Sequence, residues 1–269
     1  MKHRIFSTAL ACILALPAVA SDAWDSVKSE LYGDRVVHDG SHLIAIDAPY
    51  RTRNDSRTQI AAQIVAPRGL RVGKVTVILD DNPMPVSAVF ALDDPQASFY
   101  FDVTMRVNGP TPLHVVAETT DGQLFVAETF VKTSGQGACA APPGSDPVAA
   151  LATLGNMTLE VGGTVPVMSA GALANLEARL RKLDVDIQHP SHSGMQMDQI
   201  SLLFIPLRYV ETVEIDLDGG GYVDVTGSIS VSENPRISLS VPGSAQSVDV
   251  TMTDTDGTVS HAHKRIAGF

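Results

Sequence analysis

The stretch Phe101-Asp-Val-Thr-Met-Arg-Val107 alternates apolar and polar side chains without interruption. In a β-strand, successive side chains point to opposite faces of the sheet, so this alternation is typical of a half-buried strand. We therefore predict a strand here, with Phe101 and its alternate neighbours in a core. The polar side chains Asp102, Thr104 and Arg106 are expected to face water.

Further segments have the composition of short strands, and turn residues separate them. They lie at 74–79, 112–118 and 123–131 in the first half, and at 213–217, 223–231, 237–241 and 248–252 in the second half. Asp121-Gly122 separates two of them, and this dipeptide is typical of a tight hairpin. Short strands broken by Gly, Pro, Asn and Asp indicate antiparallel β-sandwiches.

Between the two groups, residues 133–147 are rich in Gly, Ala, Pro and Ser and show no periodicity. This composition is typical of a linker. We therefore predict two β-sandwich domains in tandem, at 21–139 and 156–269, joined by a linker at 140–155.

The segment 170–182 is compatible with two structures. Its leucines recur at spacings of three and four residues, which favours a helix. From Glu177 onward the apolar side chains alternate as far as Ile187, which favours a strand equally well. Both interpretations stay open at this point.

The chain of 269 residues carries 19 basic and 30 acidic side chains, a formal net charge of −11. An acidic surface repels nucleic acids and anionic membranes, so neither is expected as a partner. Beyond the N-terminus, no apolar run reaches the roughly 18 residues that span a bilayer. The sequence has no nucleophile elbow, dinucleotide fingerprint, P-loop or His-Glu-x-x-His helix, so we expect a non-enzymatic protein without a cofactor.

The N-terminus has the three parts of a secretory signal peptide. Lys-His-Arg at 2–4 precedes an apolar stretch that ends in Ala18-Val-Ala20. We expect residues 1–20 to be removed and the protein to be exported to the periplasm. A lipoprotein signal on Cys12 is the alternative, but the apolar core continues past that cysteine.

Removal of the signal peptide would leave Cys139 as the one cysteine of the mature chain. A single thiol in an oxidising compartment is an intermolecular partner or a reactive group, and its unperturbed pKa is about 8.5. The neighbours that would form its arm are small and leave the sulfur unshielded: Gly135, Gly137, Ala138 and Ala140. We therefore predict that Cys139 is a covalent attachment point. A linker cysteine without a function is the alternative.

A second cluster combines imidazoles with thioethers, ligands that suit copper in an exported protein. Its members are His189, His192, Met195 and Met197, to which His261 and His263 could contribute. Packing and surface roles explain the same residues, since neither spacing defines a coordination geometry. These four residues are therefore weak metal candidates.

Two acidic sequences, Asp216-x-Asp218-Gly219 and Asp254-x-Asp256-Gly257, have the oxygen ligands that calcium prefers. Neither continues into a loop with a distal glutamate ligand. We therefore predict that both are hairpin turns.

Two stretches of the first half resemble SoxY. Val131-Lys-Thr-Ser-Gly-Gln-Gly-Ala-Cys139 is similar to the end of SoxY, where a strand runs into a Gly-Gly-Cys-Gly-Gly arm. Asp81-Asn-Pro-Met-Pro-Val-Ser-Ala-Val-Phe90 is similar to the Asn-Pro-x-Pro strand junction of the same family.

Stretches of the second half resemble SoxZ. Ile187-Gln-His-Pro-Ser-His-Ser-Gly194 and the later Ile205-Pro206 are similar to the His-Pro-Met-x-Thr-Gly and Ile-Pro sequences of that family. Ser232-Glu-Asn-Pro235 and Asp254-Thr-Asp-Gly257 match later SoxZ landmarks. In the order SoxY then SoxZ, the chain resembles the fused SoxYZ-like carriers associated with periplasmic quinoprotein dehydrogenases.

The resemblance implies two immunoglobulin-like sandwiches packed together. It also implies an arm cysteine that holds intermediates of sulfur oxidation, such as those of thiosulfate oxidation, while periplasmic enzymes oxidise and hydrolyse them. Only Cys139 matches the carrier position, with Gly135 and Gly137 as the remaining glycines of the arm. Three SoxZ landmarks imply a structural role at the domain junction: His189, Pro190 and Gly194. Unlike the family arm, this one has alanines beside the cysteine and is followed by a second domain.

The leading hypothesis is a periplasmic carrier that holds a sulfur-containing or other thiol-bound intermediate on Cys139. Its expected partners are periplasmic redox enzymes: a quinoprotein dehydrogenase, a c-type cytochrome or Sox-type enzymes. One alternative is a non-catalytic assembly module for the dehydrogenase or its cytochrome, because an acidic chain favours a basic partner. The other alternative is a copper-handling protein.

Overall fold

The structure of the protein is a computed structural model that describes residues 22–135, 137–138, 147–165, 180–198 and 201–266. The predicted signal sequence at 1–20 lies outside the described residues, and so do Cys139 and Ala140. The helical interpretation of 170–179 also concerns residues that are not described.

Helix α1 (Asp22–Tyr32) belongs to a compact unit of residues 1–33, distinct from the unit of residues 34–269. The helix ends at Gly33, whose φ is +57° and whose N–H donates to the Ser29 carbonyl at 2.9 Å. A left-handed glycine of this kind is a common helix cap. Neither α1 nor any other helix in the described part of the chain is long and apolar enough to cross a membrane.

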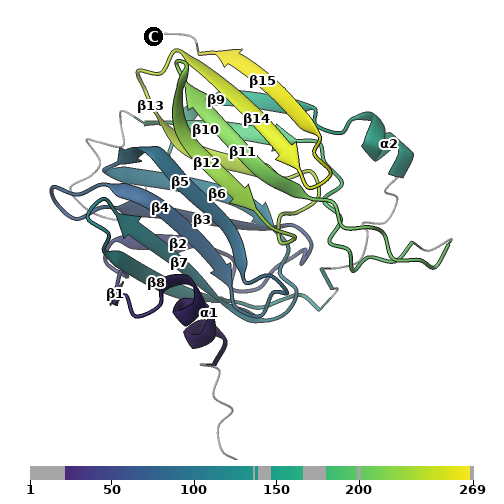
Figure 1. Cartoon of the computed structure of the whole chain (residues 1–269), viewed down its shortest axis with the longest axis horizontal. Coiled ribbons are helices and arrows are strands. Elements are labelled where there is room, and N and C mark those ends of the chain that lie inside the picture. Colours follow the sequence, from purple (N-terminus) through teal and green to yellow (C-terminus); the bar gives the residue numbers. More distant parts are fainter. Residues whose placement is uncertain (1–21, 136, 139–146, 166–179, 199–200, 267–269) are drawn as a thin grey trace, which may run out of the picture. The chain divides into compact units, whose positions relative to one another are not determined.

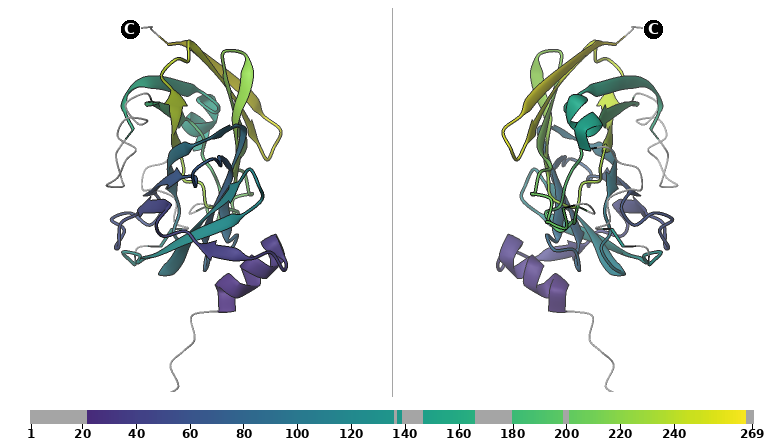
Figure 2. Two further views of the ribbon diagram at one scale, coloured as in Figure 1. Left: turned by 90° about the vertical axis from the view of Figure 1, so that its left-hand side faces the viewer. Right: turned by 90° about the vertical axis from the view of Figure 1, so that its right-hand side faces the viewer.

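Two sheets make up the second unit (Figures 1 and 2). The large sheet has nine strands in the order β1 (Val37–Asp39), β8 (Leu124–Val131), β7 (Thr111–Thr119), β4 (Val72–Leu79), β5 (Val86–Gln96), β12 (Gly220–Gly227), β11 (Val210–Leu217), β14 (Ser247–Asp254) and β15 (Val259–Arg265). The small sheet has six, in the order β2 (Ile44–Asp47), β3 (Thr58–Val65), β6 (Ser98–Met105), β13 (Arg236–Pro242), β10 (Leu180–Ile187) and β9 (Met157–Thr164). Helix α2 (Pro147–Ala152) precedes β9.

Each sheet continues from the first half of the chain into the second half. In the large sheet β5 pairs with β12, from Leu92 opposite Val223 to Ala88 opposite Gly227. In the small sheet β6 pairs with β13, where Val103 lies opposite Ile237. Both junctions are antiparallel, so the two halves are joined by backbone hydrogen bonds as well as by side chains.

The core between the sheets is shared in the same way. Phe90 of β5 and Phe101 of β6 stack with their ring centroids 4.6 Å apart, and Phe99 lies beside both. The same hydrophobic cluster includes Val225 and Leu239 from the second half. The predicted fold class is confirmed: the protein is all-β, with two antiparallel-rich sheets that fit an immunoglobulin-like two-domain fold. The predicted domain boundaries stay predictions.

One expectation about β6 is wrong. Asp102 and Arg106 do not face water, since each is less than 5% exposed. β6 lies inside the small sheet, where both of its edges are paired, with β3 and with β13. The buried polar groups have partners there: Gln59 donates to Asp102, and Arg106 donates to the Val231 carbonyl at 2.5 Å.

Other local predictions are confirmed. The apolar alternation that ends at Ile187 is strand β10, with Leu183 and Val185 fully buried. Asp218-Gly219 connects β11 to β12 with both φ angles positive, +53° and +82°. Asp254 ends β14, and its carbonyl accepts from the Gly257 N–H in the turn to β15. Both acidic sequences are therefore hairpin turns.

Candidate functional site

The site begins where β8 ends and the segment that leads to Cys139 leaves the large sheet. Lys132 extends the pairing by one residue, since its N–H donates to the Tyr50 carbonyl at 2.7 Å. Its own carbonyl accepts from the Thr52 N–H at 2.8 Å, which makes a parallel bridge beside Arg51. The loop before β3 therefore lies against the first residues after β8.

Beyond this bridge, the carboxylate of Asp55 binds the backbone of the arm. Its Oδ1 accepts from the Ser134 N–H at 2.7 Å, and its Oδ2 accepts from the N–H groups of Gly135 at 3.1 Å and Gly137 at 3.3 Å. The hydroxyl of Thr52 also donates to Oδ1. Asp55 is 1% exposed and Thr52 is 3% exposed. We call the residues Thr52, Asp55, Ser134, Gly135 and Gly137 the arm clamp.

The two glycines of the arm clamp have left-handed backbones, with φ of +93° at Gly135 and +83° at Gly137. No atom lies within 4 Å of a Cβ built at either position, so conformation rather than space requires glycine. The N–H groups of Ser134, Gly135 and Gly137 point to one carboxylate, so together they form an anion-binding nest. The next residue, Ala138, is buried.

The electrostatics of the arm clamp favour an ionised Asp55. Burial by itself raises the pKa of this carboxyl group, because it disfavours the charged form. The hydrogen bonds from Thr52, Ser134 and Gly137 outweigh burial, so the pKa of Asp55 lies below its usual value. At neutral pH the clamp is therefore a carboxylate held by neutral donors.

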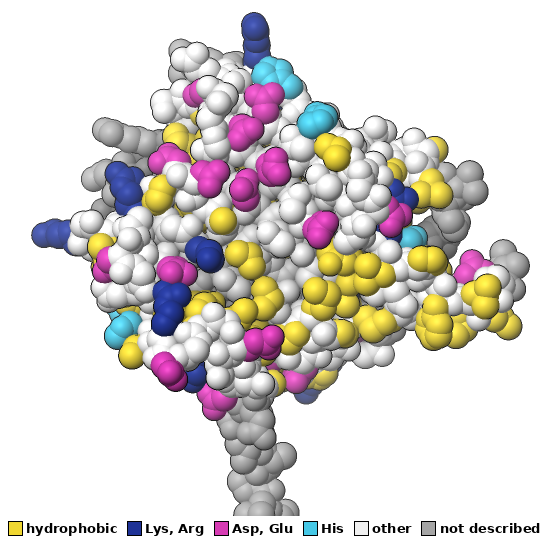
Figure 3. Space-filling model, in the orientation of Figure 1, with side chains coloured by type: hydrophobic (Ala, Val, Ile, Leu, Met, Phe, Trp, Pro, Cys, Tyr) yellow, Lys and Arg dark blue, Asp and Glu magenta, His cyan; other side chains and the backbone are white. Residues whose placement is uncertain are grey.

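A second projecting segment runs from His192 to Arg208, and we call it the apolar hairpin. Its two legs are joined by the Arg208 N–H, which donates to the His192 carbonyl at 2.9 Å, and by the Ile205 N–H, which donates to the Gln196 carbonyl at 2.8 Å. Figure 3 shows hydrophobic side chains gathered on this projection. The exposed ones are Met195, Met197, Leu202, Leu203, Phe204 and Leu207.

The base of the apolar hairpin is fixed by Asp254, whose side chain is fully buried. Its carboxylate accepts from Arg208 Nε at 2.8 Å and from the Thr258 N–H at 2.8 Å. Burial raises the pKa of Asp254, but the bonds from Arg208, Thr258 and His189 outweigh it and lower the pKa. The base of the hairpin is thus held by a buried ion pair.

His189, a weak metal candidate, belongs to this base. Its Nδ1 accepts from the Ser191 N–H at 2.9 Å, so its Nε2 carries the proton and faces Asp254 Oδ2 at 3.3 Å. Burial lowers the pKa of His189, although Asp254 acts to raise it. Both ring nitrogens are thus occupied by the protein itself.

The other metal candidates lie further out. His192 Nδ1 contacts Gln196 Oε1 at 3.0 Å, and the thioethers of Met195 and Met197 are exposed on the apolar hairpin. His261 and His263 lie on β15, where they contact Thr251 and Asp249. Within the described ranges, no three His, Cys, Asp or Glu side chains form a group that could hold a metal ion.

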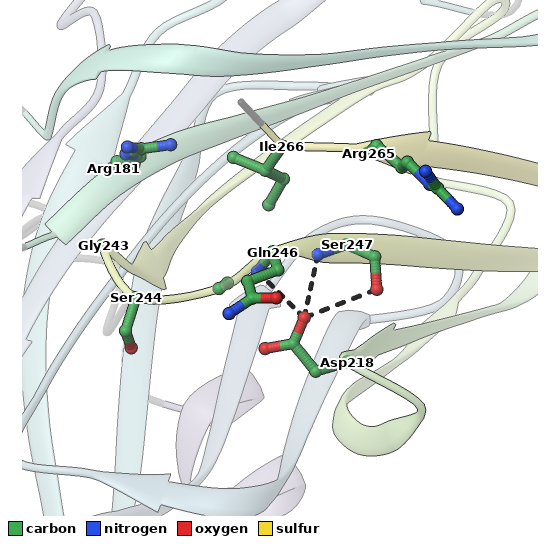
Figure 4. A pocket seen from close by; sticks show the side chains of 9 residues that line it. Arg181, Asp218, Gly243, Ser244, Gln246, Ser247, Arg265 and Ile266 are labelled. Atoms are coloured by element: carbon green, nitrogen blue, oxygen red, sulfur yellow. Dashed lines mark hydrogen bonds between the residues drawn. The ribbon is translucent and has the colours of Figure 1, made fainter. Parts of the chain in front are cut away.

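A pocket of about 850 Å³ lies in the second half of the chain (Figure 4). Arg181 and Arg265 line it together with Asp218, whose Oδ1 accepts from the Gln246 and Ser247 N–H groups at 2.9 and 2.8 Å. The carboxylate therefore joins two turns. None of the arm clamp residues lines this pocket.

Thr52 and Asp55 were not among the residues expected from the sequence. They precede the arm residues that they bind by 79 to 82 positions. Thr52-Arg-Asn-Asp55 has only the signature of a polar turn, so no local pattern points to the arm. Gly135 and Gly137 were identified as arm residues, and the structure brings both to Asp55.

Comparison with known proteins agrees with the order of the two halves. The family model of sulfur oxidation protein SoxY matches residues 28–139, so this match ends at Cys139. The family model of sulphur oxidation protein SoxZ matches residues 173–265. No match was found among curated proteins.

Among solved structures, the chain is similar to the sulfur carrier protein SoxY from Chlorobium limicola f thiosulfatophilum. The identity is 19%, the TM-score is 0.34, and the match covers 42% of this chain and 96% of that one. The two family models together span most of the chain, in the order that the sequence motifs indicate. This protein joins a SoxY domain and a SoxZ domain in one polypeptide, and it belongs to the SoxYZ-like family of sulfur-oxidation carrier proteins.

Proposed function

We propose that this protein is a periplasmic carrier that holds a sulfur-containing intermediate covalently on Cys139 for partner redox enzymes. The observation that carries the proposal is the SoxY match, which ends at Cys139, the one cysteine beyond the predicted signal peptide. The arm clamp supports it, because a built anchor at residues 134–137 is what a carrier arm needs at its base.

Loading of the thiol is an oxidation. A bond forms between Cys139 Sγ and a sulfur atom of the cargo, the thiol proton leaves to solvent, and two electrons pass to an acceptor in a partner enzyme. The thiolate is the reacting form. A partner hydrolase then uses water to cleave the bond between this sulfur and the rest of the cargo. The hydroxyl of the water leaves on the oxidised product, and its proton goes to the cargo sulfur, which stays bonded to Cys139 Sγ. We place the acceptor in a quinoprotein dehydrogenase, a c-type cytochrome or a Sox-type enzyme.

Intact-protein mass spectrometry of the protein from its native host tests this proposal. Cys139→Ser is expected to remove every sulfur adduct, and a reductant is expected to remove those of the unaltered protein. Val259→Ala changes an exposed side chain of β15, retains the thiol and should keep the adducts. A thiol that is always free under sulfur-oxidising conditions contradicts the proposal. Cell fractionation and the N-terminal sequence test export and cleavage after Ala20.

One observation favours a second candidate function, a docking or assembly module. The apolar hairpin exposes three large hydrophobic side chains by about two thirds: Leu202 at 68%, Leu203 at 69% and Phe204 at 66%. Exposed apolar clusters of this kind mark protein–protein contacts. The partner we infer is a periplasmic redox enzyme with an apolar recess.

Charge supports the same candidate. Acidic side chains gather on the outer face of the large sheet in the second half (Figure 3): Glu214, Asp216, Asp224 and Asp249. Partial burial and the nearby Asp93 and Glu214 raise the pKa of Asp224. A basic partner surface would relieve this repulsion and would be steered toward it.

Co-purification separates the two functions. The assembly module predicts that Phe204→Asp with Leu203→Asp reduces recovery of the partner enzyme, whereas Cys139→Ser does not. Val259→Asp alters another exposed apolar residue, on β15, and is the matched control. Recovery that depends only on Cys139 contradicts the assembly module.

A further inference from the structure

We propose that Asp55 is a positioning residue that anchors the start of the cysteine arm at Ser134, Gly135 and Gly137. This inference rests on the proposed carrier function of Cys139. The residues that carry it all lie in the described part of the chain: Thr52, Asp55, Ser134, Gly135 and Gly137.

The geometry is that of a built anchor. Three backbone N–H groups, from Ser134, Gly135 and Gly137, converge on the two oxygens of one buried carboxylate within 2.7–3.3 Å. Hydrogen bonds to a charged acceptor are roughly twice as strong as those between neutral groups. The Thr52 hydroxyl orients the same carboxylate. The arm therefore meets an acceptor that is already fixed in place.

Asp55 is itself held to the sandwich. Its carbonyl accepts from the Val107 N–H at 2.8 Å, just beyond the end of β6. The loop that carries it is joined to Lys132 by the hydrogen bonds of Tyr50 and Thr52. The anchor thus connects the arm to both sheets, through β8 of the large sheet and β6 of the small sheet.

The anchor limits how far Cys139 can lie from a fixed residue. Cys139 lies six positions after Thr133 but only two after Gly137. An extended chain spans roughly 3.3–3.6 Å per residue, so Cys139 lies within roughly 20 Å of Thr133 but within roughly 7 Å of Gly137. Partners would then have to approach this end of the sheet closely, and release of the clamp would extend the reach.

Chemistry explains why the anchor is an aspartate. Two separate oxygens must accept from the arm, one from Ser134 and the other from both glycines. An asparagine has a single acceptor oxygen. Its amide N–H₂ group would take the place of the other oxygen and would lie against N–H donors of the arm, to which it cannot hydrogen-bond. Asp55→Asn therefore keeps the shape and removes half of the acceptor set.

Hydrogen exchange measured by NMR on the full chain tests the anchor directly. Asp55→Asn is expected to speed exchange of the Ser134, Gly135 and Gly137 amides at least tenfold, while the amides of β8 stay unchanged. Asp121→Asn is the matched control, because that carboxylate binds only its own turn, through Thr119 and Gln123. It should leave the arm amides protected. Unchanged exchange in Asp55→Asn overturns the proposal.

The mobility of a spin label on Cys139, in a Cys12→Ser background, separates loss of the anchor from a general loss of stability. Asp55→Asn should increase the mobility of the label while the midpoint of unfolding by urea stays near that of Asp121→Asn. Equal mobility in the two variants overturns the proposal. If Asp55→Asn does not fold, Thr52→Val replaces it, and arm amides that stay as protected as before then overturn the proposal.

The result is separable from the carrier function. Neither the exchange rates nor the spin-label spectrum depends on a cargo. If Cys139 carries sulfur adducts but Asp55→Asn leaves amide exchange unchanged, the proposed anchor is wrong and the proposed carrier function stands. If Asp55→Asn speeds exchange but Cys139 carries no adduct under any condition, the anchor stands and the proposed carrier function is wrong.

Discussion

Asp55 and Asp254 are two buried carboxylates that hold the base of a projecting segment, and they do so in different ways. Each is 1% exposed. Asp254 binds the charged side chain of Arg208 and the ring of His189, and so fixes the apolar hairpin through an ion pair. Among the described residues, Asp55 accepts from neutral donors, namely the backbone N–H groups of the arm and the Thr52 hydroxyl.

The difference matters when the carboxylate is removed, because the donors that lose their acceptor are charged at Asp254 and neutral at Asp55. Without Asp254, the guanidinium of Arg208, which is 19% exposed, would lose its buried partner and keep the exposed carboxylate of Asp256 at 3.3 Å. The amides of Gly135 and Gly137 would lose a charged acceptor, but they would leave no charge without a partner. Loss of the carboxylate should therefore cost more at the hairpin than at the arm. The arm and the hairpin should therefore respond differently to the same kind of change.

The largest effect is expected at the hairpin. Asp254→Ala should reduce the free energy of unfolding by about 3–5 kcal/mol, because Arg208, His189 and the Thr258 N–H all lose the buried acceptor that they share. Urea titration followed by circular dichroism measures this loss. Asp256→Ala is the control, since its exposed carboxylate meets the same Arg208 at 3.3 Å and should cost less than about 1 kcal/mol. Equal costs for the two variants would mean that the ion pair does not hold the base.

An intermediate effect is expected at the arm. Gly137→Ala forces an L side chain into a left-handed backbone at φ +83°, which costs about 1–2 kcal/mol. Gly122, in the turn between β7 and β8, has the same φ of +83° and equally open surroundings. Gly122→Ala should therefore cost a similar amount in urea titration. Only Gly137→Ala should speed amide exchange at Ser134, and faster exchange in both variants would break the comparison.

The smallest effect separates the two bases by pH. His189 has a lowered pKa in the folded protein, so the unfolded chain binds its proton first as the pH falls below about 6.5. Stability at the hairpin should therefore decline below about pH 6.5, by at most about 1.4 kcal/mol per pH unit.

Asp55 behaves differently because its pKa is lowered in the folded protein. Its contribution to the free energy of unfolding is therefore complete above about pH 3.9 and is lost only below that value. Amide exchange between pH 7 and pH 5, corrected for intrinsic rates, should thus rise for Arg208 and stay constant for Gly137. His261→Gln, which removes a histidine of β15, should leave this contrast unchanged. A parallel rise at both amides would show that the two bases are not independent.

Much of the fold could be predicted from local pattern. The alternation in β6 and in β10 indicated strands because burial on one face imposes a period of two. Both acidic turns followed from the preference of Asp-Gly for positive φ. The burial of Asp102 in β6 could not be predicted, because it depends on neighbouring strands from distant parts of the chain.

The candidate site divides in the same way. Cys139 and the glycines of its arm are visible in the sequence, since a lone cysteine among small residues is a local feature. His189 was a weak metal candidate because a sequence shows the type of a ligand but not its hydrogen bonds. In the structure, both ring nitrogens of His189 have partners within the protein, Ser191 and Asp254. Asp55 had no local signal, because its partners lie some 80 positions later.

The sequence by itself determined the strand periodicity, the turns, the order of the SoxY and SoxZ halves and the single thiol, because each of these depends on neighbouring residues. Only the tertiary structure decided that the two halves share both sheets and that Asp55 holds the arm. Strand pairing and carboxylate–amide bonds join residues that are distant in the chain. Their partners are chosen by packing and burial after the local elements have formed.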